Sequence, residues 1–313
     1  MRHLAVPVAT TDSPLRRCSS RPENSAVKEL TLTRGVCLCG AVEYHFTGPF
    51  QMMMHCHCSI CRKHHGAAFA TFVAAPYSAF RWVRGEDAIA KYKSSEQGVR
   101  WYCRQCGSVA PTLMPDAGFA IAPAGNLDGE LGVLPQGHMF VGSKADWYPI
   151  TDALPQHAAM PPEYGGGGGV ARPTVAQREG VADGSCLCGQ VTYEVRAPVR
   201  MYHCHCSRCR RARSAAHTTN MFSSITDFAF TRGERLVTQY KVPEALRFGV
   251  AFCMRCGGKV PRVSRERGTV VVPVGALDTD PGMRPQANIF VTSKAPWFDI
   301  TDALPQFAEM PPT

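Results

Sequence analysis

The stretch HCHCSICR at residues 55–62 occurs a second time, as HCHCSRCR at residues 203–210. Two further motifs repeat at nearly the same distance: CLCG at residues 37–40 and 186–189, and CxxCG at residues 103–107 and 253–257. The offset between the repeats is 149 for CLCG, 148 for the His-Cys stretch and 150 for CxxCG. A drift of only two residues over so long a unit indicates a duplicated domain and not a solenoid array.

The repeats define the domain boundaries that we predict. The first domain covers residues 34–160 and the second covers residues 182–313. Residues 161–181 join them and include five consecutive glycines, which is typical of a flexible linker. Residues 1–33 have no sustained hydrophobic period and are predicted to be a disordered extension, in which Cys18 is an isolated thiol.

Composition excludes several classes of protein. The chain has 313 residues, of which 45% are hydrophobic, so it can form true cores and is not a small secreted scaffold held by disulfides. No stretch approaches the ~18 apolar residues of a membrane-spanning helix, and the N-terminus lacks a signal peptide, so we expect a soluble protein in the reducing cytoplasm with no membrane partner. In that compartment, its 15 cysteines are expected to be free thiols or metal ligands.

The net charge of +9 is concentrated in the second half of the chain. Residues 165–313 contain 19 basic and 12 acidic residues, a net charge of +7, whereas residues 34–164 are neutral with 10 of each. An anionic partner could use this excess, but no periodic Lys/Arg helix accompanies it. We therefore interpret it as a solvated surface and do not expect a nucleic-acid partner.

Short alternating runs of apolar residues within each copy predict a mainly β fold. Such runs occur at residues 42–46, 80–84 and 99–102, with Gly or Pro between them. No window of a dozen residues has a clean 3.6-residue period, so helix is expected only as a turn near residues 59–64.

Four cysteines in each copy form a pattern typical of a structural zinc site. They lie in two short Cys-Cys spacings, each followed by glycine: Cys37, Cys39, Cys103 and Cys106 in the first copy, and Cys186, Cys188, Cys253 and Cys256 in the second. Four sulfurs complete the tetrahedral coordination of Zn²⁺. Because the two pairs are more than sixty residues apart, each site would connect the two ends of its domain.

The other three cysteines of each copy are too few to close a tetrahedron. They are Cys56, Cys58 and Cys61 in the first copy, and Cys204, Cys206 and Cys209 in the second. Three protein ligands and one open position are typical of a catalytic zinc site, in which water or substrate is the fourth ligand. We expect His55, His57, His203 and His205 to surround these sites more often than to bind the metal. Disulfides or a redox CxxC are the alternative interpretation of the same cysteines.

The ordered set CxCG, HCHCSxCR and CxxCG resembles the glutathione-dependent formaldehyde-activating enzyme family, which includes centromere protein V. A SKAxW motif and a DxLP tail complete the resemblance in each copy, at residues 143–147 and 152–155 and again at residues 293–297 and 302–305. The resemblance implies an Mss4-like (β-tent) fold with a structural zinc on the four cysteines and a looser zinc on the three. It also implies a carbon–sulfur lyase activity that joins glutathione to formaldehyde, giving S-hydroxymethylglutathione.

That chemistry leads to further expectations about individual residues. The six cysteines of the two three-Cys motifs would be catalytic, because zinc there stabilises a thiolate or polarises an aldehyde. Arg62 and Lys63 are candidates to bind the carboxylates of glutathione, as are the arginines at 208, 210, 211 and 213. The alternative interpretation is that these residues are solvated surface charges. The alternative function is a zinc-stabilised binding module with an anionic or nucleic-acid partner and no turnover.

The two copies are not expected to be equivalent, although they could pair within the chain. The first keeps GAAF at residues 66–69, whereas the second has SAAH at residues 214–217. The second also has Asn288 where the first has His138. From these differences we expect the first copy to carry any catalysis.

Overall fold

The alternating runs of the sequence form strands in the structure. The structure is a computed structural model that describes residues 31–96, 98–166 and 175–312. Strands β2 (Glu43–Thr47), β5 (Phe80–Arg84) and β7 (Val99–Cys103) coincide with the three runs identified above. In β2, the alternate residues Tyr44 and Phe46 are 1% and 0% exposed, so the alternation places one face of the sheet in the core. The predicted mainly β fold is confirmed.

The first copy contains two sheets and a separate hairpin. The three-stranded sheet has the order β1-β2-β5, with β1 at Leu32–Val36. The five-stranded sheet has the order β10-β3-β4-β9-β8: β10 (His138–Met139), β3 (Met52–Cys56), β4 (Ala70–Pro76), β9 (Phe119–Pro123) and β8 (Thr112–Met114). The hairpin pairs β6 (Ile89–Lys93) with β7. All these pairs are antiparallel except β10 with β3, which is parallel.

The second copy repeats this arrangement with small additions. Its three-stranded sheet is β11 (Val181–Ser185), β12 (Thr192–Arg196) and β15 (Phe228–Arg232). Its larger sheet has the order β19 (Arg262–Ser264), β20 (Thr269–Pro273), β14 (Thr218–Ser224), β13 (Arg200–Cys204), β21 (Ala287–Ile289) and β22 (Gln306–Phe307). The hairpin of β16 (Val237–Lys241) and β17 (Gly249–Cys253) gains a third strand, β18 (Lys259–Val260).

Each copy has one short α-helix directly after its third strand. Helix α1 (Ser59–His65) ends at Gly66, which has φ +64°, and α2 (Ser207–Arg213) ends at Ser214, which has φ +55°. Glycine takes this left-handed conformation without strain, whereas serine adopts it at a cost. The remaining helical segments are 3-10 turns: η1 (Tyr77–Ala79), η2 (Glu86–Ala88), η3 (Pro115–Ala117), η4 (Ala124–Asn126), η5 (Val141–Ser143), η6 (Pro162–Tyr164), η7 (Ile225–Asp227), η8 (Glu234–Leu236), η9 (Val274–Ala276) and η10 (Val291–Ser293).

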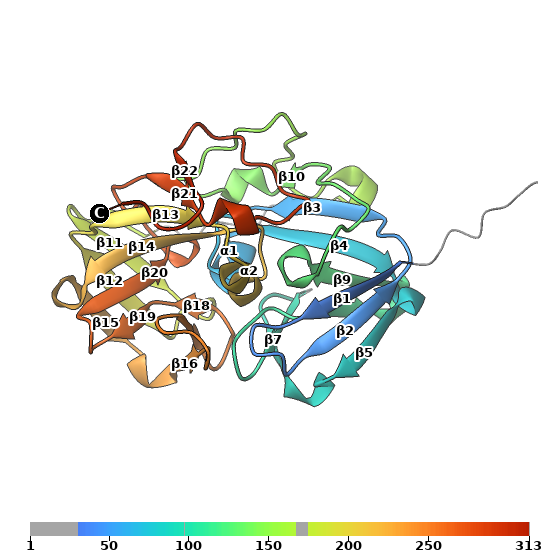
Figure 1. Ribbon diagram of the computed structural model, residues 1–313, viewed down its shortest axis with the longest axis horizontal. Coiled ribbons are helices and arrows are strands. Elements are labelled where there is room, and N and C mark those ends of the chain that lie inside the picture. The colour runs from blue at the N-terminus through green and yellow to red at the C-terminus, as the bar shows by residue number, and fades with distance from the viewer. Residues whose placement is uncertain (1–30, 97, 167–174, 313) are drawn as a thin grey trace, which may run out of the picture.

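The two helices lie between the two copies. Figure 1 shows the first copy in blue to green and the second in yellow to red, with α1 and α2 together at the centre. Helix α1 contacts η9 of the second copy, and α2 contacts η4 of the first. The backbones approach so closely that a Cβ on Gly275 would lie 2.1 Å from the carbonyl oxygen of Ala67, and one on Gly125 would lie 2.3 Å from the amide nitrogen of Ala215. The copies therefore pack as a pseudo-symmetric pair within one chain.

The strand positions can be compared with the predicted boundaries. Strand β1 begins at Leu32, two residues before the start predicted for the first domain, and β11 begins at Val181, one residue before the start predicted for the second. Cys18, the N-terminal extension up to residue 30 and the glycines from residue 167 onward lie outside the described residues.

Candidate metal centres and active site

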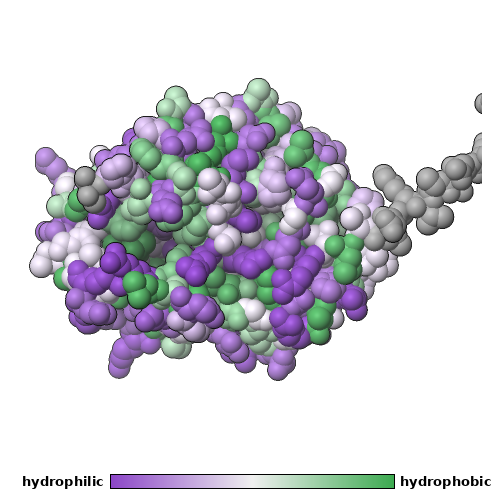
Figure 2. Space-filling model, in the orientation of Figure 1, coloured by the Kyte–Doolittle hydropathy of each residue, from purple (hydrophilic) through white to green (hydrophobic). Residues whose placement is uncertain are grey.

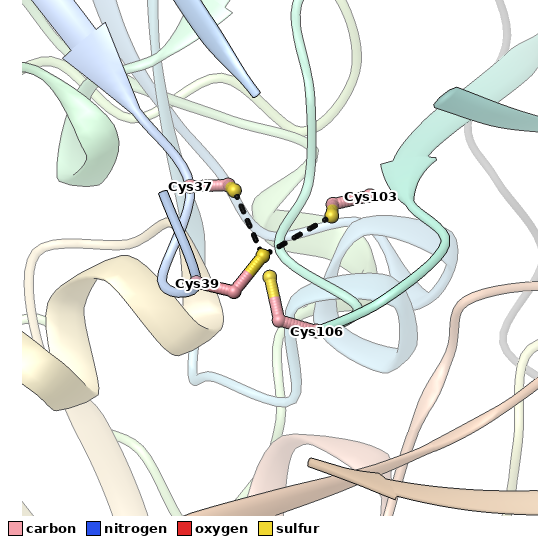
Figure 3. Close-up of side chains that lie close together, drawn as sticks. All are labelled: Cys37, Cys39, Cys103 and Cys106. Atoms are coloured by element: carbon pink, nitrogen blue, oxygen red, sulfur yellow. Dashed lines mark hydrogen bonds between the residues drawn. The ribbon is translucent and has the colours of Figure 1, made fainter. Parts of the chain in front are cut away.

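The eight cysteines assigned to structural zinc form two compact clusters. In each, the four sulfur atoms lie within 4.8 Å of one another. Figure 3 shows the first four-Cys cluster, in which the sulfurs of Cys39 and Cys103 are 3.7 Å apart; the corresponding Cys188–Cys253 distance in the second four-Cys cluster is 3.9 Å. Tetrahedral zinc with Zn–S bonds of about 2.3 Å separates its sulfur ligands by about 3.8 Å. Both clusters therefore fit the ion.

In each four-Cys cluster, a backbone amide donates a hydrogen bond to one of the sulfurs. The amide of Val42 donates to Cys37 Sγ and that of Val191 donates to Cys186 Sγ, each over 3.3 Å. Hydrogen bonds from Cys186 and Cys256 lower the pKa of Cys253 to about 4. A negative charge is thus favoured at Cys253, whereas hydrogen bonds with neighbouring thiols raise the pKa of Cys256 and that of Cys37.

The remaining six described cysteines form the first triad (Cys56, Cys58, Cys61) and the second triad (Cys204, Cys206, Cys209). Each triad brings its three sulfurs within 4.8 Å of one another. The middle cysteine is the N-cap of the following helix, and the amide of Cys61 or Cys209 donates to its sulfur over 3.3 Å. Hydrogen bonds from Cys204 and Cys209 lower the pKa of Cys206 to about 3. Strand end and helix start thus supply a three-thiol site of the type that leaves one zinc position open.

The four histidines beside the triads are held by other residues and do not belong to the thiol clusters. The hydrogen bonds are His55 Nδ1 to Thr71 Oγ1 (2.9 Å), His57 Nε2 to His138 Nδ1 (2.8 Å), His203 Nδ1 to Thr219 Oγ1 (2.9 Å) and His205 Nε2 to Asn288 Oδ1 (2.9 Å). All four are buried. One ring nitrogen of each histidine is thus bonded to a neighbouring side chain, and none of the four histidines joins a thiol cluster.

The two triads differ in their access to solvent. Cys56, Cys58 and Cys61 are each at most 4% exposed, and the space that Cys61 shares with Arg100 and Phe72 is only about 20 Å³. In the second triad, Cys204 and Cys209 are also buried, at 4% and 7% exposed, but Cys206 is partly exposed and all three cysteines line a cavity of about 640 Å³. Figure 2 shows a hollow with hydrophobic side chains on the half of the molecule that carries the second copy. A cavity of this volume is in the range that binds small organic ligands.

A difference in hairpin length accompanies this asymmetry. The loop between β6 and β7 contains residues 94–98, whereas the loop between β16 and β17 contains residues 242–248 and is two residues longer. These two residues account for the increase in the offset between the repeats, from 148 at the His-Cys stretch to 150 at CxxCG. In the second copy, the residues of this loop from Ala245 to Phe248 line the cavity.

A single substitution adds a charge beside the first triad. Arg100 of β7 pairs with Tyr92, and Val250 of β17 pairs with Tyr240, so arginine and valine occupy equivalent positions. Burial opposes the charge of Arg100, but the nearby thiols Cys61, Cys58 and Cys56 raise its pKa above the ordinary value. In the first copy, the Arg100 guanidinium therefore lies where the second copy has its cavity, and it carries a positive charge there.

A model of the glutathione-dependent formaldehyde-activating enzyme family matches residues 32–143 and 181–293. The chain belongs to this family. Each match covers one copy, so the protein has two family domains in tandem, as the motifs predicted. Among the relatives is a protein of Halomonas elongata provisionally named as a glutathione-dependent formaldehyde-activating enzyme, which is 28% identical over 127 residues, 38% of this chain and 81% of the relative.

A solved structure is also similar in sequence. The crystal structure of a Rhodobacter sphaeroides protein is 28% identical, with 33% of this chain and 97% of that chain covered and a TM-score of 0.26. Among the described residues, no helix has the length and apolar character that crossing a membrane would require.

Arg62 and Lys63 do not face a free ligand site. Both are buried, at 3% and 6% exposed, at the contact with the second copy. Lys63 Nζ lies 2.5 Å from Asp278 Oδ1 and donates to the carbonyl oxygen of Ser185 over 3.1 Å, and Arg62 donates to the carbonyl oxygen of Gly275 over 3.4 Å. These residues therefore hold the two copies together, and the prediction that they bind glutathione does not fit their contacts.

The arginines of the second copy are more informative. Arg208 is exposed at the cavity and Arg211 pairs with Asp128 of the first copy, but Arg213 is 5% exposed and lines the cavity beside the second triad. No sequence pattern separates Arg213 from the neighbouring arginines, because the burial of each depends on how α2 packs. Asn220 is a further cavity residue that the sequence does not predict. Its position in a strand two residues before Phe222 carries no distinctive motif.

Proposed function

We propose that this protein is a zinc-dependent carbon–sulfur lyase-like enzyme that joins a thiol such as glutathione to an aldehyde at the second triad. The observation that carries the assignment is the cavity of about 640 Å³ beside Cys204, Cys206 and Cys209. The first triad has the same three ligands but is enclosed, which supports a structural role for its copy. The sequence comparison predicts catalysis in the first copy, but that assignment is less consistent with the enclosed first triad.

The reaction needs a thiolate, an aldehyde held close to it, and a means of stabilising the negative oxygen that develops. Zinc bound by the second triad would supply a positive charge that stabilises the thiolate. The sulfur attacks the carbonyl carbon, a C–S bond forms, the carbonyl π bond breaks, and the oxygen takes up the proton that the thiol released. No oxidant or reductant is needed, because the product has the composition of thiol plus aldehyde.

The residues of the second copy support the reacting groups in three ways. His203 and His205, fixed by Thr219 and Asn288, hold the strand end that carries Cys204 and Cys206. The amide of Cys209 donates to Cys206 Sγ, which stabilises that sulfur as a ligand. The cavity walls hold the two reactants together, and such proximity can supply a large part of the rate enhancement.

A matched pair of substitutions tests the assignment. Cys206→Ser in the second triad and Cys58→Ser in the first are equivalent changes. The rate measured is the glutathione-dependent consumption of aldehyde after the uncatalysed rate is subtracted. We expect only Cys206→Ser to reduce this rate by at least a hundredfold. Product formation is followed by NMR of the new C–S adduct, and circular dichroism checks that both variants fold. Equal losses in the two variants would contradict the proposal.

A further inference from the structure

The wall of the second-copy cavity is mostly apolar, which formaldehyde does not explain. Its sides include Phe222, Leu246, Phe248, Val271, Ile289 and Phe290. Formaldehyde has no apolar body, and glutathione carries two carboxylates and an amine that gain nothing from such a wall. An apolar surface of this extent favours a ligand that buries hydrocarbon against it.

Polar groups without partners lie at the triad end of the same cavity. Arg213 is 5% exposed and its Nη1 has no hydrogen-bond partner, and Asn220 is 9% exposed and its Oδ1 has none. The amide nitrogen of Asn220 donates to Cys209 Sγ over 3.9 Å, so this pair borders the metal ligands. Leaving a buried donor or acceptor unpaired is costly, and a ligand that bonds to both would recover that cost.

These two residues have no counterpart in the first copy. In the first copy, Phe72 of β4 pairs with Met54 of β3; in the second copy, Asn220 of β14 pairs with Tyr202 of β13. Phe72 therefore occupies the position equivalent to that of Asn220. His65 takes the place of Arg213 at the end of its helix, and His65 Nδ1 is 2.8 Å from the backbone carbonyl oxygen of Arg213. A polar end combined with an apolar body is therefore a property of the second-copy cavity.

We propose that the aldehyde substrate of the second copy carries an apolar chain or ring, which lies against the Phe222 and Leu246 side of the cavity while its oxygen faces Arg213 and Asn220. This inference rests on the proposed function and specifies its substrate class. As the thiolate attacks, the charge that develops on the oxygen lies beside the Arg213 guanidinium, which stabilises it. Once that oxygen is protonated, its hydroxyl can donate to Asn220 Oδ1.

Binding of two stable thioethers tests the apolar body without turnover. Titration calorimetry on the zinc-loaded full chain compares S-hexylglutathione with S-methylglutathione, and we expect the hexyl compound to bind at least tenfold more tightly, because each buried methylene strengthens binding several-fold. Equal affinities would overturn the inference while leaving the proposed function in place. Failure of both compounds to bind would overturn the proposed function as well.

Two loop variants show where the hexyl group lies. Leu246 is 86% exposed, so Leu246→Lys leaves the core intact, and we expect it to remove most of the preference for the hexyl compound. Ser95→Lys, in the corresponding loop of the first copy, is the matched control and should leave both affinities unchanged. Loss of the preference in the Ser95 variant, or its full retention in the Leu246 variant, would contradict the placement.

A variant of Arg213 tests the polar end. Arg213→His installs the residue of the first copy at this position, and with hexanal and glutathione we expect kcat to fall at least tenfold. Affinity for S-hexylglutathione, which lacks the reacting oxygen, should change by less than threefold. A variant with unchanged kcat, or one that loses thioether affinity as strongly as kcat, would show that Arg213 does not act on the reacting oxygen.

Discussion

Lys63 of the first copy and Asp278 of the second form a buried ion pair, with 2.5 Å between Nζ and Oδ1 and side chains only 8% and 10% exposed. The pseudo-symmetric partners are Arg211 and Asp128, which also pair but are 33% and 38% exposed. Removing one partner of a buried pair leaves an uncompensated charge, whereas an exposed pair contributes little. The loss of a partner should therefore destabilise the protein more at the Lys63–Asp278 pair than at the Arg211–Asp128 pair.

Asp278→Asn should strongly destabilise the protein. Lys63 would keep its contacts to Ser185 but lose its counter-charge, and we expect the free energy of unfolding to fall by about 3 kcal/mol. Urea unfolding followed by tryptophan fluorescence measures the change. Asp128→Asn is the control: it removes the partly exposed carboxylate that pairs with Arg211 and with Arg34, with an expected loss below about 1 kcal/mol for each pair. Losses of equal size would mean that burial does not distinguish the two pairs.

Stability should decrease in mild acid because of buried histidines such as His65. Burial lowers the pKa of His65 to about 3, well below the ordinary value near 6.5. Below pH 6.5, His65 therefore binds a proton in the unfolded chain, whereas in the folded chain it binds one only near pH 3. The free energy of unfolding therefore falls as the pH falls from 6.5 to 3. One such residue contributes about 1.4 kcal/mol per pH unit well below pH 6.5.

A comparison with His65→Gln isolates that contribution. Glutamine retains a donor for the Arg213 carbonyl but does not titrate. We expect the stability difference between wild type and variant to be constant from pH 7 to 8 and to shift against the wild type from pH 6 to 5. A difference that stays constant through pH 5 would contradict the assignment of this slope to His65.

Metal analysis should find about four zinc ions per chain, one for each thiol cluster. A chain with Cys39→Ala and Cys106→Ala loses two ligands of the first four-Cys cluster and should retain about three. Plasma mass spectrometry of protein dialysed against zinc-free buffer gives the count. A wild-type value of two would mean that the triads do not hold zinc in the isolated protein.

Thiol reactivity should follow the difference in access between the triads. Cys206 is partly exposed at the cavity, whereas Cys58 is 3% exposed. After mild chelation, iodoacetamide should modify Cys206 at least tenfold faster than Cys58, as measured by peptide mass spectrometry. Equal rates would indicate that the first triad opens in solution as readily as the second.

Local patterns made much of the fold predictable. The three alternating runs became β2, β5 and β7, and the helical turn expected near residues 59–64 is α1. The cysteines also sorted correctly into clusters of four and three, because ligand spacing is a local property even when the two halves of a site are far apart. These features depend on short windows of sequence.

Features that depend on packing between the copies could not be predicted in the same way. The sequence makes Lys63 a candidate to bind a carboxylate of glutathione. Its actual partner, Asp278, lies in the other copy, and no sequence pattern near Lys63 indicates this ion pair. The longer hairpin was visible as a two-residue change in offset, but length alone does not indicate which side of a strand a loop will cover. The unequal cavities follow from that geometry.

The fusion of the two copies into one chain has a consequence for how their sites can change. In a symmetric homodimer, each substitution at an interface occurs twice and faces its own image. Here Gly66 and Ser214 end equivalent helices, and Arg100 and Val250 occupy equivalent strand positions, yet each was free to differ. A single gene can therefore keep one half as a rigid support while the other acquires a ligand preference of its own.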